Sequence, residues 1–99
     1  MIIVSGAFQI PAENVDAAKD AMRAMMAETV KEDGCVVYQF TQSIEDPSKF
    51  RVYEEWETEA HLKAHFDVAH MATFRAALGE LGPITRKVKM IEAGATKDL

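Results

Sequence analysis

The order in which strand-like and helix-like segments follow one another constrains the fold of this chain more than any other feature. Segments rich in β-branched and aromatic residues with alternating polarity predict strands. Segments with apolar residues at positions i, i+3 and i+7 predict helices. The resulting order is strand, helix, strand, strand, a helix in two pieces, and strand. The strands span residues 2–10, 35–44, 50–57 and 84–92, and the helices span 15–32, a segment that begins after Thr58, and 68–80.

Local signals mark the ends of these segments. Asn14 and Thr58 are good N-cap residues, because their side-chain oxygens accept backbone N–H groups that the first helical turn leaves free. Gly34 provides a C-terminal stop, and a turn at residues 45–48 joins two strands into a hairpin. Gly6 interrupts the apolar face of the first strand, which indicates a bulge or close packing by a helix.

The side-chain pattern also predicts which faces are buried. The stripe on the first helix is rich in methionine. Core packing is the more common role of such a stripe, although it can also form an adaptable ligand surface. The predicted buried faces are Ile2, Val4, Phe8 and Ile10; Val15, Ala18, Met22, Met25, Met26, Thr29 and Val30; Val36, Tyr38 and Phe40; Phe50, Val52, Glu54 and Trp56; Leu62, His65, Phe66 and Ala69; and Met71, Phe74 and Leu78.

Together these segments predict an α+β, ferredoxin-like fold, in which helices cover one face of an antiparallel sheet. With 99 residues the chain is expected to form one domain, residues 1–99, with a polar tail at about 93–99. The uncovered sheet face carries Tyr53 and Val37. We therefore predict a homodimer in which a second subunit covers this face.

Charge and composition exclude several kinds of partner. The chain has 11 Lys and Arg residues against 16 Asp and Glu residues, a net charge of −5, so we expect no binding to nucleic acid or to anionic membranes. The first apolar run is too short for a membrane span or a signal peptide. A single cysteine, Cys35, suits a reducing compartment. We therefore expect a cytoplasmic protein in which Cys35 is structural.

All three histidines, His61, His65 and His70, follow one another in the segment after the third strand. Histidine has an ordinary pKa of about 6.5 and can move protons near neutral pH. His61 and His65 are four residues apart and would share a helical face, as zinc-binding pairs do. A third ligand, from His70, Asp67 or Glu54, cannot be placed by spacing. A solvated His61 beside an inward His65 is the more common arrangement, so we predict no metal.

His65 and Glu54 both occupy apolar faces, where a polar group needs a partner or a cavity. Each could be satisfied by the other or by the backbone, and on the residues alone a structural pair is slightly favoured over a catalytic one. A carboxylate beside the imidazole would raise the pKa of the histidine and suit it to proton transfer. The surrounding aromatic residues describe either a pocket for a flat ligand or a small core, and the core is the commoner outcome. They are Tyr38, Trp56, Phe66 and Phe74, with His70 either facing the same space or capping a helix.

The run from Gly34 to Phe74 resembles the antibiotic biosynthesis monooxygenase domain family. The motifs that carry the resemblance are GCVVYQF, EDPSKF, EEW, LKAH and AHMATF. They correspond to a glycine-led strand, an Asp-Pro turn, a Glu-x-Trp that ends the third strand, and two histidines before a phenylalanine. The resemblance extends over essentially the whole chain in length and element order.

The resemblance implies a dimeric α+β barrel, each subunit of which holds a pocket between its helices and its sheet. It also implies that oxygen oxidises a quinol-like or polyphenolic small molecule, without metal, flavin or any other cofactor. On this interpretation His65 or His70 deprotonates or orients a hydroxyl of a small aromatic substrate. The implied substrate-binding residues are Trp56, Glu54, Tyr38, Phe66 and Phe74.

Two alternatives remain open: a non-catalytic dimer that binds a small molecule, and an enzyme that acts on a small signalling carbonyl compound. Haem degradation, known among relatives, is not expected. Residues 5–9 contain no Asn, and His65 stands where those relatives carry Trp. An open cavity between helices and sheet would favour an enzyme. A volume filled by Met22, Met26, Phe66 and Phe74 would count against one.

Overall fold

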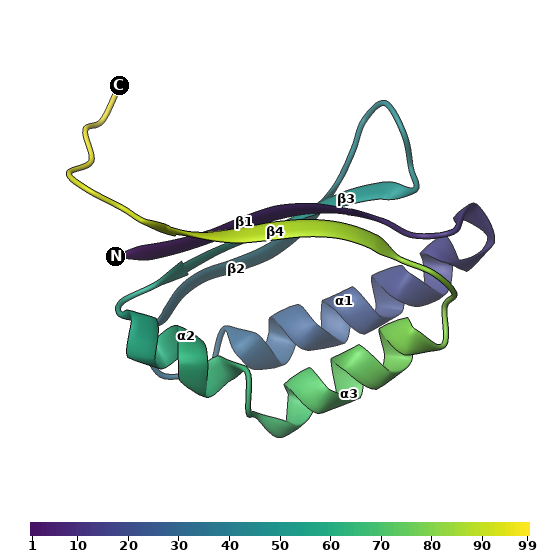
Figure 1. Cartoon of the computed structure of the whole chain (residues 1–99), viewed down its shortest axis with the longest axis horizontal. Helices are drawn as coiled ribbons and strands as arrows, with labels where there is room; N and C mark the ends of the chain where they lie inside the picture. The colour runs from purple at the N-terminus through teal and green to yellow at the C-terminus, as the bar shows by residue number, and fades with distance from the viewer.

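A computed structural model describes all residues, Met1–Leu99, and contains a four-stranded sheet with its helices on one face (Figure 1). The strand order is β2-β3-β1-β4, and every neighbouring pair is antiparallel. This arrangement confirms the predicted ferredoxin-like fold. The elements are β1 (Ile2–Gln9), the 3₁₀ turn η1 (Ala12–Asn14), α1 (Val15–Thr29), β2 (Cys35–Gln42), β3 (Lys49–Trp56), α2 (Glu59–His65), α3 (Ala69–Gly79) and β4 (Thr85–Glu92).

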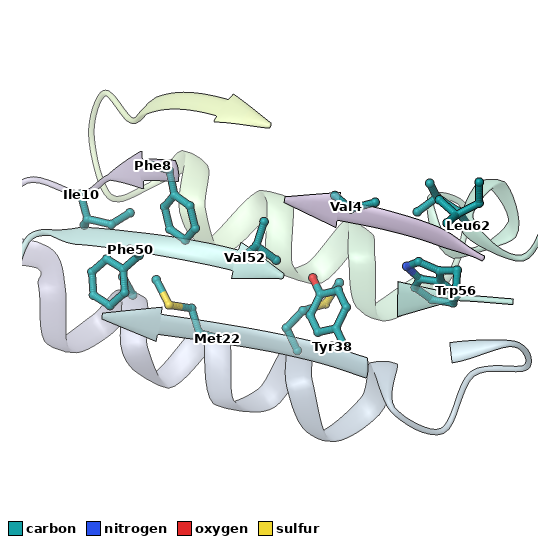
Figure 2. Packing of buried hydrophobic residues seen from close by; sticks show 12 residues of the cluster. Val4, Phe8, Ile10, Met22, Tyr38, Phe50, Val52, Trp56 and Leu62 are labelled. Atoms are coloured by element: carbon teal, nitrogen blue, oxygen red, sulfur yellow. The ribbon is translucent and has the colours of Figure 1, made fainter. Parts of the chain in front are cut away.

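Strands β1 and β3 pair at the centre of the sheet and carry much of the core. Val4 lies opposite Glu54, and Phe8 lies opposite Phe50. Because side chains alternate between the two faces of a strand, each such pair points toward the helices together. The predicted inward faces of both strands are confirmed, and their buried apolar members include Ile2, Val4, Phe8, Phe50, Val52 and Trp56 (Figure 2).

Strand β2 departs from the predicted alternation at its start. The register shifts between Cys35 and Val37, and Val36 is 48% exposed. The prediction that Val36 shares a face with Tyr38 and Phe40 is therefore wrong, because a bulge adds one residue and reverses the parity. Tyr38 is buried, and Phe40 packs against the core.

Gly6 marks a close approach of β4 to β1. A Cβ at this position would lie 2.5 Å from the Cα of Val88 and would also overlap the Val88 side chain. The predicted close packing is confirmed, but the neighbour is a strand and not a helix. The absence of a side chain at Gly6 therefore lets β4 bend against the centre of the sheet.

Helix α1 begins and ends differently from the prediction. Asn14 occupies the N-cap position without a capping bond, and its Nδ2 instead donates to the carbonyl oxygen of Leu81 at 2.8 Å. The helix ends at Thr29 and not at residue 32. Val30 is 54% exposed, so its predicted place in the buried stripe is wrong. The chain leaves the helix here and reverses direction at Gly34, whose φ is 77°.

The methionine stripe of α1 belongs to the core. Met22 and Met25 are each 2% exposed, and Met22 points into the space beneath the sheet, beside Phe50 (Figure 2). Met26 is partly buried, and its Sδ accepts the backbone N–H of Phe40 at 3.4 Å. The prediction that these methionines pack in the core is confirmed.

The predicted inner stripe of α2 is narrower than expected. Leu62 and His65 are buried, whereas Phe66 and Ala69 are exposed. The helix ends at His65, and the chain turns before α3, so residues after His65 no longer follow the same helical face. No helix of the chain combines the length and the apolar composition needed to cross a bilayer.

Candidate active site

A cavity of about 310 Å³ opens between the sheet and helices α2 and α3. Thirteen of its 18 lining residues are hydrophobic, and its size falls in the range of small-molecule sites. The lining does not include Met22 or Met26, so these side chains do not fill this space. Its aromatic residues are Phe8, Tyr38, Phe40, Phe66 and Phe74.

One partly buried carboxylate joins two histidines beside this cavity. Oε2 of Glu32 lies 2.7 Å from Nδ1 of His65 and 2.7 Å from Nε2 of His70. The exposed side-chain fractions are 12% for Glu32, 1% for His65 and 24% for His70. The carboxylate thus accepts a hydrogen bond from each imidazole, and the three side chains form one network.

Chain reversals bring these three residues together. Glu32 lies in the turn after α1, where its N–H donates to the Thr29 carbonyl oxygen at 3.0 Å and its own carbonyl accepts the N–H of Cys35 at 3.2 Å. His65 is the last residue of α2, and His70 lies in the first turn of α3. Because Glu32 has left the helix, its side chain can reach both of these helix ends.

His65 has a buried nitrogen without a hydrogen-bond partner, and the residue is part of the cavity lining. Burial lowers the pKa of His65 below its ordinary value, and the hydrogen bond and charge of Glu32 oppose that shift only in part. The neutral imidazole therefore predominates at neutral pH, with its proton on the Nδ1 that faces Glu32. Nε2 has no hydrogen-bond partner, and His65 lines the cavity.

Glu54 does not pair with His65. Its Oε1 accepts the indole N–H of Trp56 at 2.9 Å, whereas His65 bonds to Glu32. The proposed Glu54–His65 pair is therefore wrong, because β3 directs both Glu54 and Trp56 to the same face, where they satisfy each other. Burial raises the pKa of Glu54 to about 7. The cavity thus holds a carboxyl group that takes up a proton more readily near neutral pH than an exposed glutamate does.

The predicted aromatic wall is only partly present. Tyr38 and Phe74 line the cavity, and Phe66 lines it from a position that is 45% exposed. Trp56 is 0% exposed and is not part of the lining, because it packs beneath His65 with ring centroids 4.9 Å apart. Burial and the charge of Glu54 raise the pKa of Tyr38, so its phenol keeps its proton.

The other two histidines do not reach the cavity. His70 is absent from the lining and contacts the site through Glu32. His61 lies apart from this network: its Nδ1 is 2.8 Å from the Thr58 hydroxyl, and its Nε2 is 3.7 Å from Asp33. The backbone N–H of His61 donates to Thr58, which confirms the predicted cap of α2.

Glu32, His65 and His70 also form the set that could hold a metal ion. Their three donor atoms lie within 4.8 Å of one another, and two imidazoles with one carboxylate suit Zn²⁺ or a similar divalent ion. The pair considered from the sequence, His61 with His65, does not form. Each imidazole already lies within hydrogen-bond distance of Glu32, so hydrogen bonds can hold these three side chains together as a metal ion would.

Glu32 is the residue that the sequence analysis missed. Two observations could have indicated it: a histidine on a buried helical face needs a polar partner, and Glu32 stands beside the Gly34 stop where the chain leaves α1. The prediction that the helix continues through residue 32 concealed this position.

Comparison with known proteins places these features in context. A family model described as antibiotic biosynthesis monooxygenase matches residues 1–77. A protein from Deinococcus radiodurans, named as a candidate antibiotic biosynthesis monooxygenase, has a solved structure with a TM-score of 0.92 and 24% identity, covering 100% of this chain and 98% of that one. At that identity the similarity shows the fold alone.

Two further solved structures are similar. One, from Nitrosomonas europaea, carries the same description and has a TM-score of 0.88 and 25% identity, covering 94% of this chain and 98% of that one. Another, from Bacteroides thetaiotaomicron, is described as a conserved protein of unknown function and possible oxidoreductase. It has a TM-score of 0.85 and 26% identity and covers 93% and 96% of the two chains. No protein of curated function matches this chain.

Proposed function

The chain belongs to the antibiotic biosynthesis monooxygenase family, and from this premise we propose that it oxidises a quinol-like or polyphenolic small molecule with oxygen, without a metal or flavin. The observation that carries the proposal is the buried, unpartnered Nε2 of His65, a residue that lines an aromatic cavity, with Glu32 bonded to the opposite nitrogen. That arrangement is what a general base requires.

The first step is removal of a proton. A substrate hydroxyl donates to Nε2 of His65, and the phenolate forms as the imidazole takes the proton. Glu32 holds the Nδ1 proton in place and stabilises the imidazolium that results. Phe40 and Phe74, with ring centroids 5.5 Å apart, pack against the ring and exclude water from it.

The phenolate then reacts with oxygen. It transfers one electron to O₂, and the resulting radical and superoxide combine at a ring carbon that bears hydrogen. The peroxide takes the proton from His65. Water is then eliminated: the hydrogen on that carbon leaves as a proton, and the O–O bond breaks. One oxygen atom remains on the ring as a carbonyl and the other leaves as water.

Glu54 is suited to the last step. With a pKa of about 7, a substantial fraction of its carboxyl group is protonated at neutral pH and can protonate the departing hydroxide. The group lines the same cavity as His65. In this mechanism His65 and Glu54 contact the substrate, whereas Glu32 and His70 act through His65.

We also propose a homodimer. Tyr53 and Val37 lie on the sheet face opposite the helices, and no element of this chain covers that face (Figure 1). A second copy would bury both side chains. Sedimentation equilibrium at micromolar concentration tests this, and a monomer would contradict it.

Oxygen uptake with a panel of hydroquinones tests the proposed activity. The protein is first dialysed against EDTA, and we expect uptake to persist. His65→Gln should lower kcat by roughly 10²–10⁴-fold, whereas the matched variant His61→Gln, outside the network, should not. Circular dichroism checks that both variants fold.

Three results would contradict the proposal. Unchanged oxygen uptake in His65→Gln would show that His65 is not the general base. Loss of uptake after dialysis, restored by a divalent ion, would make Glu32, His65 and His70 a metal site. Saturable binding of the hydroquinones with no uptake would favour the non-catalytic binding dimer.

A further inference from the structure

The charged side chains around the cavity are mostly basic, although the protein as a whole is acidic. Acidic residues outnumber basic ones by 16 to 11 in the whole chain. On the cavity lining, however, Glu54 is the only carboxylate, and the cationic residues are Arg75, Arg86 and Lys89. This local reversal of charge indicates an anionic ligand.

None of these three cations is neutralised by the protein. No salt bridge includes Arg75, Arg86 or Lys89. Arg75 donates one hydrogen bond, at 3.3 Å to the carbonyl oxygen of Phe66, and the other two side chains donate none. An exposed guanidinium with free N–H groups is suited to hold a carboxylate through two parallel hydrogen bonds.

The register of β4 shows that Arg86 and Lys89 point to opposite faces of the sheet. Arg86 is paired with Phe8, whose side chain faces the helices, so Arg86 points to the cavity side of β4. Lys89 has the opposite parity and is paired with Ser5, so its ammonium group points to the other face. Arg75 lies on α3, and its Nη1 donates to the carbonyl oxygen of Phe66, the residue after His65, so its guanidinium lies at the His65 end of the cavity. Arg86 is therefore the cation that defines the anion site at the other end.

The same register places Arg86 far from the end of the cavity where His65 and Glu54 are proposed to act. Along β1, Phe8 is paired with Arg86, and Val4 is paired with Glu54. Four residues of strand correspond to roughly 13 Å. Phe8, Phe40 and Phe74 line the space between the two ends, with Phe8 and Phe40 centroids 5.9 Å apart. A ligand that reaches both ends must be elongated as well as aromatic.

We propose that the cavity binds elongated aromatic hydroxy acids, with the carboxylate on Arg86 and the hydroxyl at His65. This inference rests on the proposed function in using His65 as the hydroxyl acceptor, and it adds the substrate class. It is tested by binding alone, with probes that do not react with oxygen.

The probe pair is 6-hydroxy-2-naphthoate and 2-naphthol, which differ only in a carboxylate at the end distant from the hydroxyl. Calorimetric titration should give a Kd about tenfold lower for the acid, and this preference should shrink as NaCl rises to 0.5 M. Arg86→Gln should abolish the preference while leaving the Kd of 2-naphthol unchanged. Lys87→Gln removes the same charge from the opposite face of β4 and should leave the preference intact.

A third probe, 3-hydroxy-2-naphthoate, places hydroxyl and carboxylate side by side and tests the length requirement. It should bind more weakly than the 6-hydroxy isomer. Equal Kd values for the acid and 2-naphthol, equal effects of Arg86→Gln and Lys87→Gln, or equal binding of the two isomers would each overturn the inference.

Failure here is separable from failure of the proposed function. Preference for the acid without oxygen uptake by any hydroquinone would leave the anion site standing and remove the activity. Uptake that depends on His65, with no preference for the acid, would do the reverse.

Discussion

Nδ1 of His65 lies 2.7 Å from Oε2 of Glu32, although 33 positions separate the two residues in the sequence. The contact places the proton of the neutral imidazole on Nδ1 and leaves Nε2 without a partner. It resembles in principle the way in which a buried carboxylate orients a catalytic histidine in hydrolases. Glu32 is therefore a positioning residue, and its effect on the reaction can be separated from its effect on folding.

Replacement of Glu32 should change both the rate and its pH dependence. In Glu32→Gln we expect kcat to fall by about 10–100-fold, as for other residues that orient a functional histidine. Glu32 raises the pKa of His65, so its removal lowers that pKa further. The fall in rate on the acid side, where His65 becomes protonated, should therefore move to lower pH. Oxygen uptake between pH 5 and 8 measures both effects.

The matched control is Glu28→Gln. Glu28 lies in the last turn of α1, four residues before Glu32, and forms an exposed pair with Lys31, away from the histidines. It should leave the rate and the pH profile unchanged. A rate loss in Glu32→Gln without any shift of the acid limb would indicate that Glu32 has only a structural role.

His70 should contribute less than His65. The sequence analysis treated both as catalytic candidates, but the hydrogen bond of the His70 side chain is to Glu32, and His70 does not line the cavity. His70→Gln retains an N–H donor for Glu32, so we expect a loss in kcat of less than about tenfold, with KM unchanged. His70→Ala, which has no donor, should lose more. Equal losses in His65→Gln and His70→Gln would contradict this order.

The fold was largely predictable because its signals are local. The alternation over β3 identified Phe50, Val52, Glu54 and Trp56 as one face, and the pairing with β1 then follows from burying that face. The exceptions lie where one residue changes the geometry. The bulge at the start of β2 leaves Val36 exposed, and no glycine or other residue in that strand indicates from the sequence that a bulge occurs there.

The site was less predictable because it depends on long-range contacts. Sequence spacing indicated that a buried His65 needs a polar partner, but it could not decide between Glu54 and Glu32. The choice depends on two structural details. Helix α1 ends before Glu32, so that the Glu32 side chain can reach His65, and Glu54 and Trp56 lie on the same face of β3, where they bond to each other. Arg86 was not noticed as a cavity residue, because the face of β4 is known only once its register with β1 is known.

Glu54 should make stability depend on pH. Its pKa is about 7 in the folded protein against an ordinary value of 4.5. Between these values the native state keeps a proton that the unfolded state has released, so the free energy of unfolding falls as pH rises. The fall amounts to about 3 kcal/mol at most between pH 4.5 and 7. Urea denaturation of wild type and Glu54→Gln at pH 5 and pH 8 isolates this contribution.

In Glu54→Gln the amide cannot titrate, and its oxygen can still accept the indole N–H of Trp56. The variant should therefore lose less stability than wild type between the two pH values. Glu57→Gln, at an exposed position just after β3, should behave like wild type. A wild-type pH dependence in Glu54→Gln would show that other groups cause it.

The close approach at Gly6 should be sensitive to a single methyl group. In Gly6→Ala the new Cβ would overlap the side chain and the backbone of Val88, so β4 must move away from β1. We expect the free energy of unfolding to fall by about 1–3 kcal/mol. Because Val88 lines the cavity, binding of 2-naphthol should weaken as well. Gly94→Ala is the matched control, since no atom lies within 4 Å of its added Cβ. Equal urea midpoints for the two variants would contradict the view that a bare backbone at Gly6 is required for β4 to close over the cavity.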